Sequence, residues 1–201
     1  MTSERYSIAL EGLKIHVSAV RFRPCPLSSV MAELNPSIAP LVARLSGTDA
    51  DDRADAAEAL CRAGEEAAPA ATALVAACGD ADDRVREWAA AALEDLGPPA
   101  EGQHAELIPL AASTHPLVAY WAVTLLGRGG EASVDAVPVL TDCLASGGPL
   151  EVRQRACWAL GKIGPAAASA RQALEAAASD SDARLSRLAG EALASLGPAT
   201  R

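Results

Sequence analysis

Five glycines divide this chain of 201 residues at nearly constant intervals. Gly64, Gly97, Gly130, Gly164 and Gly197 are separated by steps of 33, 33, 34 and 33 residues. A repeat period in this range is typical of solenoid proteins, in which each repeat buries its apolar face only against its neighbours. The period therefore constrains the fold more than any other feature, and it favours an open array of repeats over a single compact core.

Each glycine ends a similar segment of thirteen residues. The clearest copy is VRQRACWALGKIG at 152–164, and the other copies begin at Asp52, Val85, Val118 and Leu185. Apolar or small residues recur at segment positions 1, 5, 8, 9 and 12, which is the stripe of one helix face and not the alternation of a strand. The closing glycine fits a left-handed cap at the helix C-terminus.

A shorter helix is predicted before each of these segments. Its marker is a leucine with the same period, found at Leu41, Leu74, Leu107, Leu140 and Leu174. The turn between the two helices reads DADD in the first two copies and contains Ser with Asp or Pro in the later ones, so it supplies N-cap side chains or a proline for the first helical turn. The repeating unit is therefore helix, capped turn, helix, glycine.

These segments lack the TPLH opening of ankyrin repeats and the spaced Trp, Gly, Tyr and Pro of tetratricopeptide repeats. The Val-Arg opening, the paired alanines, Ala-Leu-Gly and the final Ile-Gly resemble HEAT repeats, most closely the short HEAT-like repeats of bacterial proteins related to phycobilisome lyases. The resemblance implies an all-α fold, a right-handed α-α superhelix or solenoid of five HEAT-like helix pairs. Within an array over 37–201, the glycines divide the repeats at about 37–64, 65–97, 98–130, 131–164 and 165–197.

Residues 1–36 lack the repeat and are predicted to be a separate N-terminal extension, either disordered or a cap on the first helix pair. Their loose alternation also allows a hairpin around Glu11 and Gly12. A third interpretation takes Met31 as the natural start, with Ser37 capping the first helix.

The charge balance bears on possible partners. The net charge is −9, and residues 37–97 alone hold 13 acidic and 5 basic side chains. Nucleic-acid binding needs a basic surface that displaces counterions, and anionic membranes attract basic segments, so we expect neither partner. No stretch is apolar enough to cross a membrane and the start lacks the features of a signal peptide, so we expect a cytoplasmic protein.

The sequence offers no recognisable catalytic or metal site. The five cysteines show no C-x-x-C spacing and are interpreted as reduced thiols in or near the core. None of the histidines, His16, His104 and His115, stands at metal-ligand spacing from another, and we interpret His115 as a solvated turn residue. No nucleophile or phosphate-binding motif is present. We therefore expect no catalytic residues, no metal, no cofactor and no enzymatic activity.

Two columns of charged residues repeat with the array. The aspartates of the turns at 49–52 and 80–83 would lie beside one another, which could suit Ca²⁺, but they are better explained as caps of the following helices. Arg53, Arg86 and Arg153 occupy segment position 2, where the third repeat has Ala119 and its turn lacks Asp. This joint absence predicts a structural ladder of Asp and Arg that joins turn to helix.

The aromatic residues of the array gather on the second helices of its middle repeats. In HEAT-like arrays these helices line the concave face, and segment positions 3, 7 and 10 point away from the core. Small residues nearby, among them Thr124 and Gly127, would leave a groove. Trp88 and Trp121 can instead fill gaps between alanine-rich helices. The predicted partner-binding residues are Tyr120, Trp158, Trp88, Trp121, Glu87, Gln154 and Arg155.

The leading hypothesis is a non-enzymatic, monomeric scaffold that binds a protein or peptide on the concave face. Trp, Tyr and Arg are the residue types enriched at binding hot spots. Acidic surroundings of the aromatic patch predict a basic or mixed-charge partner. The alternative is a bilin-lyase-like subunit, or a chaperone acting on a chromophore protein, in which the aromatic residues and Cys157 would contact a tetrapyrrole.

Overall fold

The computed structural model describes residues 38–100, 102–145 and 147–198. These residues form α-helices in five successive pairs, with short 3-10 helices (η) between some of the pairs. The predictions made for residues 1–36 lie outside the described residues. The helices are α1 (Ile38–Leu45), α2 (Ala50–Ala63), η1 (Gly64–Ala70), α3 (Ala71–Ala77), α4 (Asp83–Asp95), α5 (Gln103–Ala111), α6 (Pro116–Arg128), η2 (Gly130–Ala136), α7 (Val137–Asp142), α8 (Leu150–Ile163), η3 (Gly164–Ala170), α9 (Arg171–Ala178) and α10 (Ala183–Leu196).

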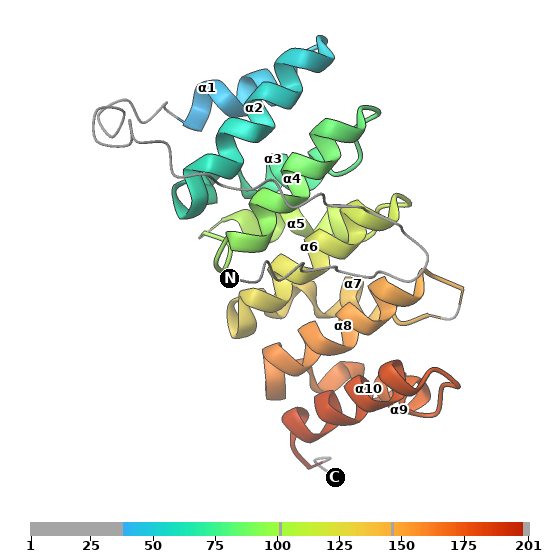
Figure 1. Cartoon of the computed structure of the whole chain (residues 1–201). Helices are drawn as coiled ribbons and strands as arrows, with labels where there is room; N and C mark the ends of the chain where they lie inside the picture. Colours follow the sequence, from blue (N-terminus) through green and yellow to red (C-terminus); the bar gives the residue numbers. More distant parts are fainter. Residues whose placement is uncertain (1–37, 101, 146, 199–201) are drawn as a thin grey trace, which may run out of the picture.

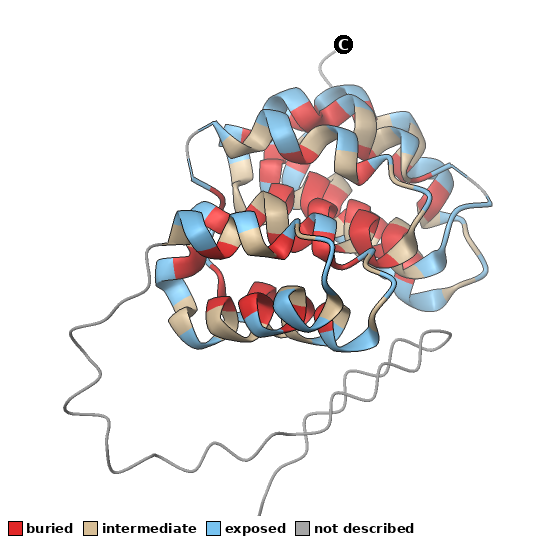
Figure 2. Ribbon diagram, turned by 90° about the horizontal axis from the view of Figure 1, so that it is seen from above, coloured by how far each residue is buried: buried red, intermediate tan, exposed pale blue. Residues whose placement is uncertain are grey.

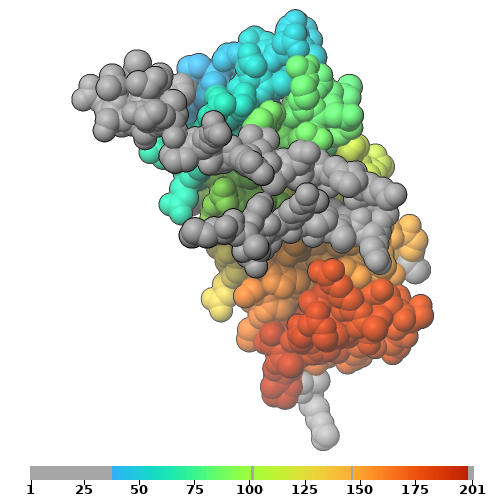
Figure 3. Space-filling model, viewed as in Figure 1, coloured from blue at the N-terminus to red at the C-terminus, as the bar shows by residue number. Residues whose placement is uncertain are grey.

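The helices stack in two layers along one axis. The second helix of each pair lies in one layer, formed by α2, α4, α6, α8 and α10, and the first helices lie behind it (Figure 1). The space-filling view shows the first pair at one end of an elongated stack and the last pair at the other (Figure 3). The chain is thus an α-α solenoid, as the glycine period predicts. We call the exposed side of the second-helix layer the second-helix face.

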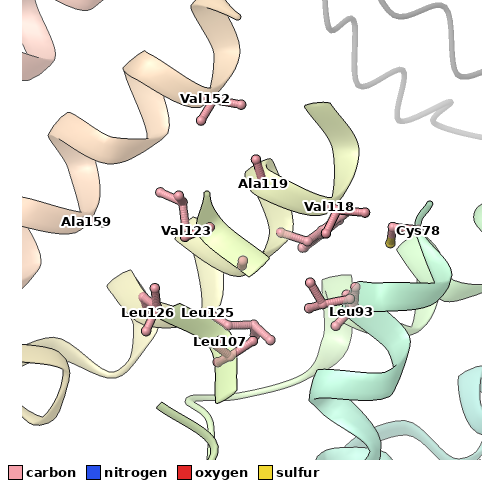
Figure 4. Close-up of a cluster of buried hydrophobic side chains, with 14 of the residues drawn as sticks. Cys78, Leu93, Leu107, Val118, Ala119, Val123, Leu125, Leu126, Val152 and Ala159 are labelled. Atoms are coloured by element: carbon pink, nitrogen blue, oxygen red, sulfur yellow. The ribbon is translucent and has the colours of Figure 1, made fainter. Parts of the chain in front are cut away.

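The apolar stripe of the second helices makes the core. Segment position 5 is alanine in every copy, and Ala56, Ala89, Ala122, Ala156 and Ala189 are all fully buried. Buried residues concentrate between the layers, while the outer surfaces are exposed (Figure 2). In the middle of the array, leucines and valines of α6 contact residues of the pairs on both sides (Figure 4). Alanine at the crossing points lets the helices approach closely, which explains how a chain with 3% aromatic residues closes its core.

The helix starts follow the predicted capping chemistry. The carboxylates of Asp49, Asp82 and Asp182 accept backbone N–H bonds from Asp52, Arg84 and Leu185 at the starts of α2, α4 and α10. The turns without such an aspartate place Pro116 and Pro149 at the starts of α6 and α8 instead. Both solutions leave fewer backbone donors without a partner in the first helical turn.

The helix ends agree with the sequence only in part. Gly64, Gly130, Gly164 and Gly197 have positive φ angles, whereas Gly97 does not. Where ψ is known it is extended, for example −139° at Gly164, so these caps do not have the left-handed helical conformation that the sequence predicted. After Gly64, Gly130 and Gly164 the chain turns directly into a 3-10 helix, which the sequence did not predict; after Gly97, the consecutive prolines Pro98 and Pro99 replace it.

The second-helix layer is interrupted once. α2 packs closely on α4, α6 on α8 and α8 on α10, whereas the backbones of α4 and α6 approach each other closely at few points, and we call this wider junction the gap. Side chains still meet across it, with Leu93 of α4 in the same buried cluster as Val118 and Leu125 of α6 (Figure 4). α3 links the two blocks by contacting α5 and α6. Arg128 crosses the gap: its guanidinium donates to the backbone carbonyls of Leu93, at 2.7 Å, and of Glu94 and Leu96 at the end of α4. The array therefore consists of two closely packed blocks, joined through α3 and Arg128.

Candidate functional site: an aromatic and arginine stack on the second-helix face

Three predicted residues meet on the second-helix face. Arg155 of α8 lies between two rings, with its guanidinium carbon 4.8 Å from the ring centre of Tyr120 and 5.0 Å from that of Trp158. It also donates a hydrogen bond to the Tyr120 hydroxyl oxygen. We call Tyr120, Arg155 and Trp158 the aromatic–arginine stack. Lys162 extends it, with Nζ 5.9 Å from the Trp158 ring centre.

Helix geometry and one glycine position the stack. Arg155, Trp158 and Lys162 follow the i, i+3, i+7 spacing, so they share one side of α8. Trp158 lies against Gly127 of α6, where a β-carbon would stand only 2.3 Å from a ring carbon. The prediction that Thr124 and Gly127 leave an open groove is therefore wrong: Trp158 occupies the space at Gly127, and Thr124 is buried and bonded to the Tyr120 carbonyl.

A small pocket of about 90 Å³ lies beside the stack, across three successive second helices. Its walls come from α6, α8 and α10, namely Tyr120, Glu151, Gln154, Arg155, Trp158, Arg184 and Leu188. The Gln154 amide is fixed by donating to the Asp182 carboxylate at 2.9 Å. Glu151, Arg184 and Leu188 were not predicted, although Glu151 precedes Arg155, and Arg184 precedes Leu188, by the four residues that align side chains on a helix.

The other predicted contact residues lie outside this pocket. Trp121 is only 6% exposed, packs edge-on to Tyr120 with ring centres 5.5 Å apart, and has Arg128 over its ring. Its burial beside the gap between α4 and α6 favours the packing role that the sequence left open over the predicted role in partner binding. Trp88 is half-buried against the core and Glu87 is exposed on α4, so neither lines the pocket.

The local charge also differs from the expected acidic border. The charged residues of the pocket wall are Glu151, Arg155 and Arg184, and Lys162 is next to Trp158. Acidic side chains instead dominate residues 37–97, in the first two helix pairs. Around the pocket, basic side chains therefore outnumber acidic ones, and the acidic border that the sequence predicted lies nearer the other end of the array.

The turn aspartates bond to protein groups. Arg53 donates to both carboxylate oxygens of Asp80, at 2.7 and 2.9 Å, and Arg153 donates to Asp180 at 2.8 Å. Each arginine thus joins one repeat to the turn of the next, which confirms a structural Asp–Arg ladder. The ladder is interrupted in the middle: Arg86 pairs with Asp83 of its own turn, and Ala119 offers no charge.

The same arrangement explains the turns that were compared with a Ca²⁺ site. Asp51 and Asp82 bond to Arg84, which lowers the pKa of Asp82 to about 2, and Asp52 bonds to Arg44. Within the described parts of the chain, no group of three or more His, Cys, Asp or Glu side chains is arranged to hold a metal ion. The capping interpretation therefore fits the geometry.

The described cysteines are free thiols, and burial raises the pKa of each. Cys157 is fully buried, and its pKa is raised to about 12. Its suggested contact with a tetrapyrrole is therefore wrong, because the sulfur faces the core. His115 stands at the N-cap position of α6, but its Nδ1 is buried, so it is not the fully solvated turn residue that was predicted.

Together these features define an α-α solenoid of paired helices with an aromatic pocket on its second-helix face. The sequence matches the family model of HEAT repeats over residues 38–106 and 104–194, and the chain belongs to the HEAT-repeat family. No curated protein matches the sequence. Among the described helices, none is long and apolar enough to span a membrane.

Solved structures with similar folds come from different settings. An engineered protein is 25% identical and matches with a TM-score of 0.58, covering 79% of this chain and 78% of that one. The complex of CpcE and CpcF of phycocyanin lyase from Nostoc sp. is 22% identical, with a TM-score of 0.59, over 81% of this chain but 65% of that one. A designed armadillo repeat protein in complex with the peptide (KR)4 is 20% identical, with a TM-score of 0.56, over 79% of this chain and 81% of that one.

Proposed function

We propose that this chain is a non-enzymatic scaffold that binds a protein or peptide on its second-helix face, at the aromatic–arginine stack. The observation that carries the proposal is Arg155 held between Tyr120 and Trp158 beside a pocket. An arginine that is already ordered between two rings loses little conformational freedom on binding, and Trp, Tyr and Arg dominate binding hot spots.

The fold is compatible with this role. Helical solenoids present extended surfaces that their repeats build together, and the pocket here needs three successive pairs. The designed armadillo protein with a bound (KR)4 peptide and the CpcE–CpcF complex resemble this chain in fold only, and they supply examples of such a fold with a peptide or a protein partner.

A displayed library of random peptides, selected on the immobilised full chain, tests the proposal. We expect enriched peptides whose binding is lost with Trp158→Ala and retained with Trp88→Ala. The control also removes a half-buried tryptophan from a second helix, but one outside the pocket. Circular dichroism verifies that both variants keep their helices. Enriched peptides that bind equally well to Trp158→Ala, or no enrichment at all, would contradict the proposal.

The lyase-like alternative has weaker support in the geometry, since Cys157 faces the core. This alternative makes a separate prediction: the absorbance spectrum of a bilin would change on incubation with the full chain, and Trp158→Ala would reduce the change. An unchanged spectrum with free bilin, together with peptide binding at the pocket, favours the scaffold.

A further inference from the structure

The basic side chains of the array fall into three groups. Seven described arginines form ion pairs with carboxylates, namely Arg44, Arg53, Arg62, Arg84, Arg86, Arg153 and Arg187. Arg128 and Arg171 donate to backbone carbonyls at helix ends. Among the described residues, this leaves Arg155, Lys162 and Arg184 without a carboxylate or a carbonyl partner.

These three cations lie together. Arg155 and Arg184 line the same pocket, and Lys162 lies by the ring of Trp158, which also lines it. In a chain of net charge −9, most cations are neutralised by the acidic side chains around them. A cluster of cations that pairs with no carboxylate among the described residues, beside partly exposed rings, is complementary to an anionic group on a partner.

The pocket also limits which anion fits. Arg155 is fixed by the two rings and keeps further N–H donors beyond its bond to Tyr120, since a guanidinium has five. Such a fork matches a carboxylate. Glu151, in the same wall, opposes a doubly charged phosphate more strongly than a singly charged carboxylate. Leu188 and the Trp158 ring supply apolar surface next to the cations.

We infer that the partner segment is an acidic peptide: Arg155 and Arg184 bind an Asp or Glu side chain, and Trp158 and Leu188 hold a neighbouring apolar side chain. This inference rests on the proposed function and replaces the expected basic or mixed-charge partner. The acidic first two repeats repel such a peptide and confine it to the last three.

The peptide selection described above supplies the first test. Peptides that depend on Trp158 are expected to be enriched in Asp or Glu next to Leu, Phe or another apolar residue. Enriched peptides that depend on Trp158 but are basic or neutral overturn the inference and leave the proposed function standing. An absence of peptides that depend on Trp158 overturns both. Stronger binding of a phosphopeptide than of its Glu counterpart also overturns the choice of a carboxylate.

A charge-reversal pair supplies the second test, on one enriched peptide carrying a fluorescent label. Arg184 is an exposed position in α10 that forms no ion pair with a described residue, and Arg184→Glu is expected to weaken binding about tenfold or more in fluorescence polarisation. Arg187→Glu makes the same charge change on the same helix, but Arg187 pairs with Glu191 and does not line the pocket, so binding should stay within about twofold. Equal losses for the two variants would show a general charge effect and overturn the inference.

Discussion

Gly127 shows how one small residue decides the shape of the site. The Trp158 ring can approach α6 this closely only because position 127 has no β-carbon. Glycine is otherwise unfavourable inside a helix, by about 1 kcal/mol relative to alanine. The close approach of the ring thus accounts for a residue that helix propensity alone would disfavour.

Alanine substitutions at two glycines separate these effects. Gly127→Ala is expected to destabilise the fold by about 1–3 kcal/mol, since the added carbon would stand 2.3 Å from the Trp158 ring and displace it. Gly190 is an exposed position of α10 with no neighbouring atom within 4 Å of an added β-carbon, so Gly190→Ala is expected to stabilise the fold by about 0.5–1 kcal/mol. Urea unfolding gives both values. A stabilising Gly127→Ala would show that Trp158 does not need this contact.

Residue spacing alone could identify part of the site. Tyr120, Arg155 and Trp158 were predicted, because position along a helix determines which side chains point away from the core. For Trp121 the sequence left packing and binding open, since its burial depends on the separation of α4 from α6. That separation arises from tertiary packing, which the residue pattern of a single helix does not reveal.

At the scale of the elements, the Arg–Asp pairs connect each repeat to the next. Arg53 and Asp80 are 15% and 13% exposed, and Asp80 also accepts the backbone N–H of Asp82 at the start of its turn. One carboxylate thus orders its own turn and holds the preceding helix α2. Bonds from Arg53 keep the pKa of Asp80 below its usual range.

The pKa shift gives a pH-dependent prediction. A carboxylate whose pKa is lowered by folding contributes stability above its unfolded pKa, about 3.9, and loses it as the pH falls through the folded value. Asp80→Asn should therefore cost about 1–3 kcal/mol at pH 7, and the cost should shrink below about pH 4. Urea unfolding of both proteins between pH 7 and pH 3 measures it.

The matched control is Asp135→Asn in η2, an exposed residue that forms no ion pair with a described residue. It should change stability by less than about 0.5 kcal/mol at every pH. A cost for Asp80→Asn that stays constant down to pH 3 would show that the carboxylate charge does not contribute.

For the whole molecule, the period of the glycines predicts the stack of helix pairs but not its interruption. The repeat spacing is nearly the same at every junction, including the one between α4 and α5. What differs there is local chemistry: Pro98 and Pro99 follow Gly97 where the other repeats form a 3-10 helix, and the Asp–Arg ladder is absent. A constant length can therefore conceal a change in the path of the chain.

The interruption predicts that stability is divided between two blocks. The first block, α1 to α4, has only two helix pairs, fewer than the three or so that repeat arrays usually need, so it depends on its contacts with α5 and α6. Arg128→Met keeps most of the apolar stem beside Trp121 but leaves the carbonyls at the end of α4 without their charged donor, at a cost of about 1.5–3 kcal/mol.

Hydrogen exchange can locate that cost. In Arg128→Met, the amides of α2 and α4 should exchange faster while those of α8 and α10 keep their protection, because nearest-neighbour arrays can open from one end. Arg171→Met is the control, since Arg171 donates to the Gly197 carbonyl at the other end of the array and does not cross the gap. It should leave the exchange of α2 and α4 unchanged. Uniformly faster exchange in all helices of Arg128→Met would mean that the array unfolds as one unit and does not open first at the junction between α4 and α6.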